Sequence, residues 1–152
     1  MKTPSASRTT MTEYVLPTHA NALGNVFGGQ ILAWMDICAA ICAQRHSGTV
    51  AVTAGIDDLA FERPIKVGQV VKLEARVTAT FRSSLEVEVF VHGEDATTGV
   101  TWACVTAFLT FVAIDGTGAR VDVPVLVCES DEERARQREA TDRRSQRLAR
   151  RR

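Results

Sequence analysis

An aspartate in the middle of an apolar stretch is the residue of this sequence that most needs a chemical explanation. Asp36 lies between Trp34–Met35 and Ile37–Cys38, in a segment whose apolar spacing predicts a helix from Gly28 to about His46. An ionised carboxylate is costly to bury without partners, and aspartate is a poor residue for a helix interior. Two interpretations follow. Asp36 is either a carboxylate on a narrow exposed stripe or facing a sheet hydroxyl, or a general base in a dry cleft.

Two glycines at the start of this predicted helix provide a complementary group. The backbone N–H groups of a first helical turn have no partner within the helix and lie at the positive end of its dipole. Because Gly28 and Gly29 have no side chains, a ligand oxygen can approach these N–H groups closely. They form a candidate oxyanion site for a carbonyl that develops negative charge, although paired glycines also serve loop geometry alone.

The segments around the helix predict a sheet that positions it. Strand-like patterns occur once before the helix and four times after it, at Met11–Leu16, Val50–Phe61, Gln69–Phe81, Ser84–Glu94 and Val100–Asp115. Short connections between them favour antiparallel pairing. The helix is apolar around most of its circumference and therefore belongs in the interior. We expect an α+β fold in which a five-stranded antiparallel sheet wraps one long central helix.

Composition is consistent with one globular unit and two flanking segments. The 152 residues, 45% of them hydrophobic, can bury a core without metal or disulfides. We expect a flexible arm over residues 1–10, a domain over 11–127, and an arginine-rich tail over 128–152 that is helical or disordered. From Glu129 the tail has nine arginines and six acids but no aromatic residue to stack on bases, so nucleic-acid binding is not expected.

Cysteine spacing and hydropathy bear on the cellular location. Cys38 and Cys42 lie one helical turn apart and Cys104 and Cys128 are isolated, so the four do not supply the ligand set of a zinc site. The sequence has no apolar run of transmembrane length and no signal-like N-terminus. We therefore expect a cytoplasmic protein with reduced core cysteines, no bound metal and no membrane contact.

The stretch from His19 to Asp36 resembles the signature of hot-dog-fold acyl-CoA thioesterases. It reads HANALGNVFGGQILAWMD, and the subgroup that it resembles holds the bacterial short- and medium-chain and the brain-type acyl-CoA hydrolases. Further similarities follow in order at the family's spacing, in Phe61–Gly68, Arg82–Ser84 and Thr110–Asp115. The resemblance covers residues 11 to 116 and does not include the tail.

This resemblance implies hydrolysis of acyl-CoA to a free acid and CoA, with no cofactor besides the CoA of the substrate. Asp36 falls where the family has its catalytic carboxylate. Asn21 falls where an asparagine helps to hold the thioester or the water, and Gly28 falls where a backbone N–H polarises the carbonyl. Asp36 as general base and Asp36 as nucleophile, through an anhydride, both remain open.

The same resemblance implies where CoA binds. A turn that the family places near bound CoA is matched by Arg82, Ser83 and Ser84. These residues are candidates for phosphate or pantetheine contacts, although a plain hairpin turn explains them nearly as well. We also expect Gly29 to contact the substrate. Asp57 matches an acidic position frequent in the family and is a reserve base near the cleft.

The spacing of Gly28 and Asp36 predicts a composite site. Eight residues of one helix separate the two by about 12 Å, whereas a base and an oxyanion donor must both lie within about 3 Å of the reacting atoms. Two such helices running antiparallel about a twofold axis can meet both conditions. We therefore expect an obligate homodimer, and the resemblance implies further assembly to a tetramer or hexamer.

Two other functions remain open. A hot-dog dehydratase would pair a histidine with the helix carboxylate, and the helix stretch around Asp36 offers none. A non-catalytic acyl-CoA sensor would use the same pocket. The presence of Asn21, Gly28 and Asp36 together favours catalysis over sensing.

Overall fold

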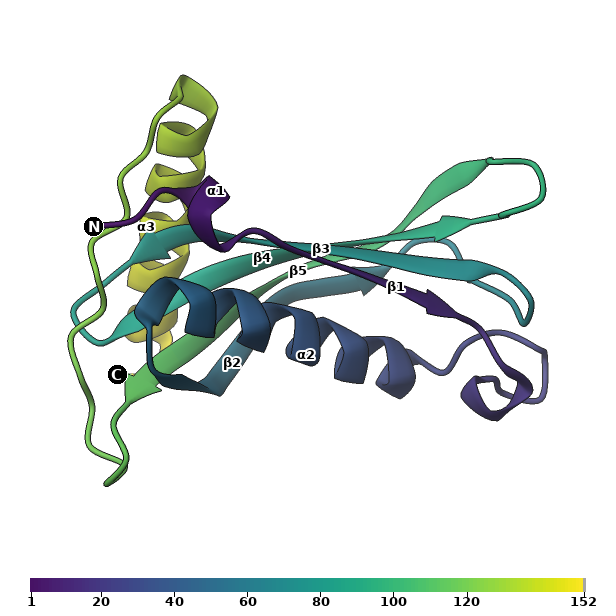
Figure 1. The fold of residues 1–152 in the computed structure, drawn as a ribbon, viewed down its shortest axis with the longest axis horizontal. Helices are drawn as coiled ribbons and strands as arrows, with labels where there is room; N and C mark the ends of the chain where they lie inside the picture. Colours follow the sequence, from purple (N-terminus) through teal and green to yellow (C-terminus); the bar gives the residue numbers. More distant parts are fainter. Residues whose placement is uncertain (152) are drawn as a thin grey trace.

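The long helix runs along one face of a strongly curved sheet (Figure 1). The computed structural model describes residues 1–151, apart from the side chain of Asp58. Its elements are α1 (Pro4–Ser7), β1 (Thr9–Tyr14), the 3₁₀ turn η1 (Pro17–His19), α2 (Gly28–Ser47), β2 (Val50–Phe61), β3 (Val70–Thr80), β4 (Ser84–Glu94), β5 (Thr101–Ile114) and α3 (Asp131–Arg150). The strands form one antiparallel sheet in the order β1-β3-β4-β5-β2. The predicted helix and five strands are confirmed, with small shifts at their ends.

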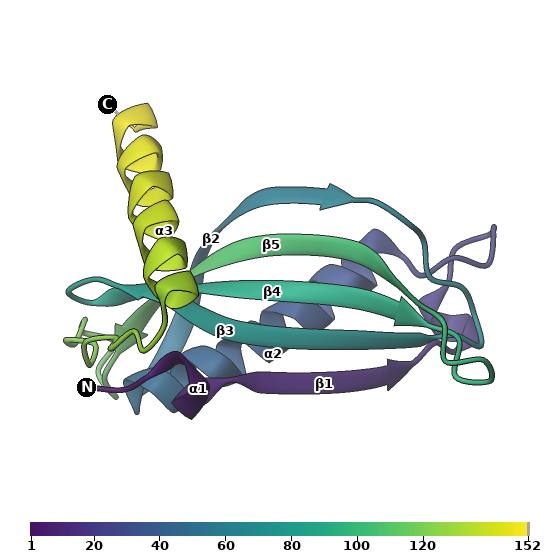
Figure 2. The same cartoon turned by 90° about the horizontal axis from the view of Figure 1, so that it is seen from above.

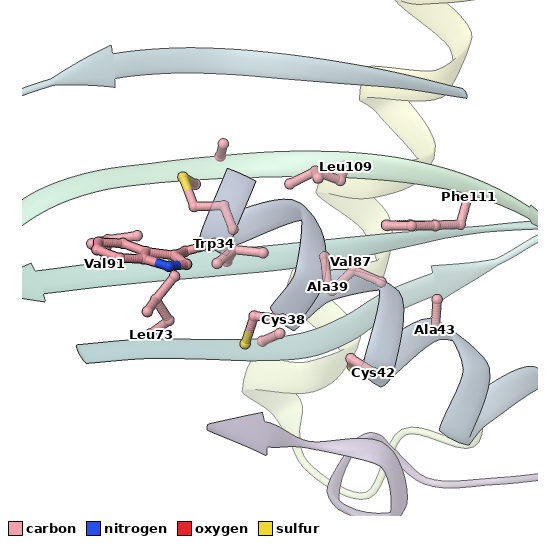
Figure 3. Close-up of a cluster of buried hydrophobic side chains, with 14 of the residues drawn as sticks. Trp34, Cys38, Ala39, Cys42, Ala43, Leu73, Val87, Val91, Leu109 and Phe111 are labelled. Atoms are coloured by element: carbon pink, nitrogen blue, oxygen red, sulfur yellow. The ribbon is translucent and has the colours of Figure 1, made fainter. Parts of the chain in front are cut away.

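The core lies between α2 and the sheet. Figure 3 shows Trp34, Cys38, Ala39, Cys42 and Ala43 of the helix beside Leu73, Val87, Val91, Leu109 and Phe111 of the strands. All ten of these side chains are buried, which explains why the helix is apolar on most of its circumference. The helix ends at Gly48, whose left-handed backbone (φ 72°) lets its N–H donate to the Gln44 carbonyl oxygen. In the described part of the chain, no helix is long and apolar enough to cross a membrane.

The first eight residues pack against the domain, whereas we expected a flexible arm over residues 1–10. Pro4 and Ser7 of α1 are buried, and β1 begins at Thr9 instead of Met11. The backbone N–H of Lys2 donates to the Val125 carbonyl oxygen at 3.1 Å. The sequence did not predict this packing, because hydrogen bonds of Lys2 and two small buried residues, Pro4 and Ser7, make the contacts instead of an apolar stripe.

The arginine-rich segment, for which the sequence left helix or disorder open, forms α3. The Ser130 side chain caps this helix by accepting a hydrogen bond from the Glu133 N–H at 3.1 Å. Acids occupy the first turn and arginines the last, as the helix dipole favours. Figure 2 shows α3 lying across the face of the sheet opposite α2. The sheet is therefore covered on both faces where α3 crosses it.

The Trp102 side chain, which packs directly on the backbone of Gly93, connects the loop between β2 and β3 to the sheet. A Cβ added to Gly93 would lie 2.3 Å from the Trp102 ring, so only glycine fits beneath this indole. The indole N–H of Trp102 donates to the Pro64 carbonyl oxygen at 3.2 Å. The Arg63 guanidinium lies 4.7 Å from the centre of the same ring. Trp102 thus holds the loop that begins after Phe61.

We predict that Gly93→Ala destabilises the protein. The new methyl group must displace the Trp102 ring, which should lower the free energy of unfolding by about 1–3 kcal/mol, the usual effect of overpacking. Urea denaturation followed by tryptophan fluorescence measures the change. Gly116→Ala is the matched control, because a Cβ at Gly116 meets nothing within 4 Å. Equal stability of the two variants would contradict the prediction.

Candidate active site

Asp36 faces the edge strand β2. Its Oδ1 atom accepts a hydrogen bond of 2.6 Å from the hydroxyl of Thr53. Asp36 is half-buried and Thr53 is exposed, so the pair lies where the core meets the surface. Within the described residues, Asp36 Oδ2 has no hydrogen-bond partner and can accept one from a water molecule. The sequence interpretation of a carboxylate facing a sheet hydroxyl therefore holds, and it leaves one carboxylate oxygen available for chemistry.

The N-terminus of α2 opens into a hollow of about 270 Å³. Gly28 lines this hollow together with Asn21, Phe61 and Ile65. The preceding residue, Phe27, makes no side-chain capping hydrogen bond to the helix, so the first N–H groups keep their capacity to donate. A Cβ at Gly28 would lie 3.5 Å from the Phe61 ring, whereas one at Gly29 would meet nothing within 4 Å. Gly28 therefore faces the hollow, and Gly29 faces open space outside it.

Asn21 shapes the loop that leads into this hollow. Its Oδ1 atom accepts hydrogen bonds from the backbone N–H groups of Leu23 at 3.0 Å and Asn25 at 3.1 Å. Such side-chain-to-backbone bonds are typical of asparagine in turns. The carbonyl end of the amide is thus engaged in the loop. The NH₂ end is the part that can contact a ligand.

Within one chain, the two parts of the predicted active site are far apart. Asn21 and Gly28 meet at one hollow, while Asp36 lies eight residues further along the same continuous helix. That separation is about 12 Å, or about two turns. The geometry of a single chain therefore gives a donor end and a carboxylate end that cannot act on the same small group.

A second pocket, of about 240 Å³, is strongly basic. The turn Arg82–Ser84 lines it with Arg120 of the segment after β5. Arg144 and Arg147 of α3 also line it, together with Arg151, which directly follows the helix. Thr110 also lines the pocket; it is 9% exposed, and its buried hydroxyl has no partner among the described residues. A concave site with five guanidinium groups and an unpaired hydroxyl can bind a polyanion.

Sequence reasoning missed three arginines of this pocket: Arg144, Arg147 and Arg151. Their spacing of three and four residues places them on one helix face, and this signal was present in the sequence. The sequence did not show which face of the sheet the helix docks on, because no apolar stripe on the helix marks the contact. Ala140 is the one buried residue within Asp131–Arg150.

Asp57 lies against α3. Its Oδ2 accepts a hydrogen bond of 2.6 Å from Arg147 Nη1, and it does not line the hollow at Gly28. The expectation of a reserve base near the cleft is therefore not supported by the geometry. Thr53 and Asp57 are four residues apart, so unbroken alternation would turn both toward the same face of the sheet. A register shift between Thr53 and Gly55 breaks this alternation and turns Asp57 toward the opposite face.

The buried cysteines do not supply a nucleophile. Burial raises the pKa of the Cys38 thiol to about 12 and the pKa values of the Cys42 and Cys104 thiols to about 11. Since the thiolate is the reactive form, these residues are unreactive near neutral pH. They behave as small apolar groups of the core.

The match to known families decides the classification. Residues 23–100 match the model of the thioesterase superfamily. An uncharacterized acyl-CoA thioester hydrolase of Bacillus subtilis is 38% identical, and the match covers 98% of this chain and 95% of that protein. The chain belongs to the thioesterase superfamily. A rat acetyl-coenzyme A thioesterase is 35% identical over 91% of this chain, which spans a quarter of the length of that relative.

Solved structures of thioesterase-superfamily proteins share the whole architecture. A hexameric acyl-CoA thioesterase superposes with a TM-score of 0.94 at 38% identity, covering 99% of this chain and 97% of the other. The acyl-CoA hydrolase of Staphylococcus aureus, in complex with butyryl coenzyme A and coenzyme A, superposes with a TM-score of 0.90 at 34% identity, covering 99% of this chain and 92% of the other. The predicted α+β hot-dog fold is thus confirmed.

Proposed function

We propose that this protein hydrolyses acyl-CoA thioesters at sites formed between two copies of the chain. The observation that carries the proposal is that α2 combines an uncapped glycine N-terminus with a half-buried carboxylate held by Thr53. The thioesterase-superfamily membership and the butyryl coenzyme A bound by the Staphylococcus aureus relative support the substrate class. The cytosolic human acyl coenzyme A thioester hydrolase, 33% identical over 88% of this chain, supports a cytoplasmic location.

The proposed reaction is acyl transfer to water. The thioester carbonyl oxygen accepts a hydrogen bond from the Gly28 N–H, which stabilises the oxyanion of the tetrahedral intermediate. The Asn21 NH₂ group orients the thioester or the water. Asp36 of the second copy removes a proton from water as the water oxygen attacks the carbonyl carbon. Collapse of the intermediate breaks the C–S bond, and the CoA thiolate takes up the proton that Asp36 removed from water. No cofactor takes part.

The edge strand β2 supports the dimer. A strand at a sheet edge has unpaired backbone groups that can pair with a second copy. Large apolar side chains of β2 are also exposed: Val50, Val52, Ile56, Leu59 and Phe61. Ile37 of α2 is 50% exposed beside Asp36. Pairing two β2 edges about a twofold axis covers these side chains and sets the two α2 helices antiparallel. Hexameric relatives support further assembly to a hexamer.

The basic pocket is the proposed site for the phosphates of CoA. It joins the turn Arg82–Ser84, which we expected near CoA, to the arginines of α3. Guanidinium groups bind phosphate oxygens through paired, charge-assisted hydrogen bonds. The unpaired Thr110 hydroxyl would gain a partner when the pocket is filled. Binding energy from this remote group would hold the thioester in place at the reacting end.

Thr53 is a proposed positioning residue that sequence reasoning did not single out. We predict that Thr53→Val lowers kcat by about tenfold and leaves KM nearly unchanged, because valine keeps the shape but loses the hydroxyl that orients Asp36. Steady-state kinetics with the best acyl-CoA measures this. Thr53→Ser, which keeps the hydroxyl, should retain most of the turnover. A similar loss in both variants would point to packing instead of hydrogen bonding.

The test of the function is thiol release over a panel of acyl-CoAs from acetyl to palmitoyl, with CoA binding measured in parallel. Turnover of at least one thioester supports the proposal and gives the chain-length preference. Binding of acyl-CoA without released thiol would favour the sensor. Hydration of an enoyl-CoA without thiol release would favour the dehydratase.

A further inference from the structure

Helix α3 is anchored to the sheet by one arginine that reaches a buried acid. Arg143 donates to the two carboxylate oxygens of Glu86, at 3.0 Å from Nε and 2.8 Å from Nη2. Glu86 is 2% exposed and also accepts a hydrogen bond of 2.6 Å from the Thr78 hydroxyl. Burial favours a lower pKa for the Arg143 guanidinium, but the hydrogen bonds and charge of Glu86 outweigh this effect and raise its pKa. Two parallel hydrogen bonds therefore fix the Arg143 guanidinium on the Glu86 carboxylate.

A second acid–arginine pair lies one turn further along the helix. Arg147 donates to Asp57 at 2.6 Å, and the two side chains are 17% and 19% exposed. Aromatic rings support the same helix face, with the Arg143 guanidinium 3.6 Å from the centre of the Phe108 ring. Since Ala140 is the one buried residue of α3, arginine contacts hold most of this helix on the sheet.

Arg147 has two roles in this arrangement. It pairs with Asp57, and it lines the basic pocket together with Arg144 and Arg151. Arginine loses much side-chain freedom when it binds a ligand. A guanidinium has five N–H groups in a fixed fork, and Asp57 engages Nη1 alone. Asp57 can therefore hold the guanidinium in one orientation while the other N–H groups stay available to a phosphate.

We propose that Asp57 is a positioning residue that orients Arg147 toward the phosphates of CoA, on a helix that Glu86 docks through Arg143. This inference rests on the proposed function, because it takes the basic pocket as the CoA site. It also replaces the expected role of Asp57 as a reserve base. If Asp57 instead only neutralised the charge of Arg147, the effect on binding would have the opposite sign. Removing the Asp57 carboxylate would then strengthen the binding of a polyanion.

The experiment compares Asp57→Asn with wild type on an acyl-CoA and on the pantetheine thioester of the same acyl group, which has no nucleotide. We expect KM for the acyl-CoA to rise about tenfold, the effect of one charge-assisted hydrogen bond, with kcat unchanged. KM and kcat for the pantetheine thioester should not change. Asp142→Asn is the matched control, since Asp142 is an exposed carboxylate on α3, the helix that holds Arg147. Thermal melting of each variant checks that it is folded.

A double-mutant cycle identifies the route of the effect. On an Arg147→Met background, Asp57→Asn should have no further effect on KM, because Asp57 acts through that arginine. A fall or no change in KM for Asp57→Asn alone would overturn the proposal, and so would an equal loss with the pantetheine thioester. Titration with CoA separates this inference from the proposed function: Asp57→Asn should weaken CoA binding about tenfold, whether or not the wild type hydrolyses any thioester.

Discussion

Replacing Asp36 with asparagine is expected to lower kcat for thioester hydrolysis by about 10²–10⁴-fold, the contribution of a general base. Asparagine has nearly the same shape and can still accept the hydrogen bond from Thr53 at Oδ1, so the fold should be unchanged. It cannot accept a proton from water or attack the carbonyl. Thiol release measures the loss, and titration with CoA should show that binding persists, because the basic pocket lies on the opposite face of the sheet.

The control for Asp36→Asn is Asp142→Asn, which removes the same charge from an exposed site on α3 and should retain full turnover. Turnover retained by Asp36→Asn would overturn the assignment of the carboxylate. Hydrolysis by wild type in ¹⁸O-labelled water under single-turnover conditions then separates the two mechanisms. Label appears in the released acid if water attacks directly, and in the Asp36 carboxylate if an anhydride forms and water attacks the aspartyl carbonyl.

Gly28→Pro is expected to lower kcat by about 10²–10³-fold, because it removes a single oxyanion donor, the backbone N–H. Gly28 is the first residue of α2, a position where proline is well tolerated. Phe27 before it has the extended conformation (ψ 137°) that a following proline requires. Gly28→Ala is the matched control: it adds a Cβ in ordinary contact with Phe61 but keeps the N–H. Equal activity of the two variants would contradict an oxyanion role.

These two inactive variants also test the composite site. If each site takes Gly28 from one copy and Asp36 from the other, a dimer of one Asp36→Asn chain and one Gly28→Pro chain has one intact site. Random pairing of equal amounts should therefore restore about a quarter of the wild-type sites. Thiol release after co-refolding of the two variants measures this. A mixture that stays inactive, although mixed dimers are present by native mass spectrometry, would show that the site does not cross the interface.

Much of the fold could be predicted from the sequence because local patterns encode it. The apolar circumference of the stretch from Gly28 to about His46 indicated a buried helix, and alternation within Ser84–Glu94 indicated a half-buried strand. The structure bears out both, with ends shifted by one residue or none. The separation of Gly28 from Asp36 also followed from the sequence alone, since helical rise is fixed by backbone geometry.

The parts that the sequence did not determine depend on docking between distant segments. Thr53 is 17 residues from Asp36 in sequence, and the packing of α2 against β2 brings its hydroxyl within 2.6 Å of the carboxylate. Asp57 was a plausible base from the sequence, but a register shift in β2 turns it to the other face of the sheet, where it pairs with Arg147. The arginines of α3 read as a solvated tail, because arginine contacts and one alanine hold that helix in place of an apolar stripe. Periodicity thus determined which segments are helix or strand, whereas tertiary packing decided which charges face one another, because ion pairs leave no periodic signal in a sequence.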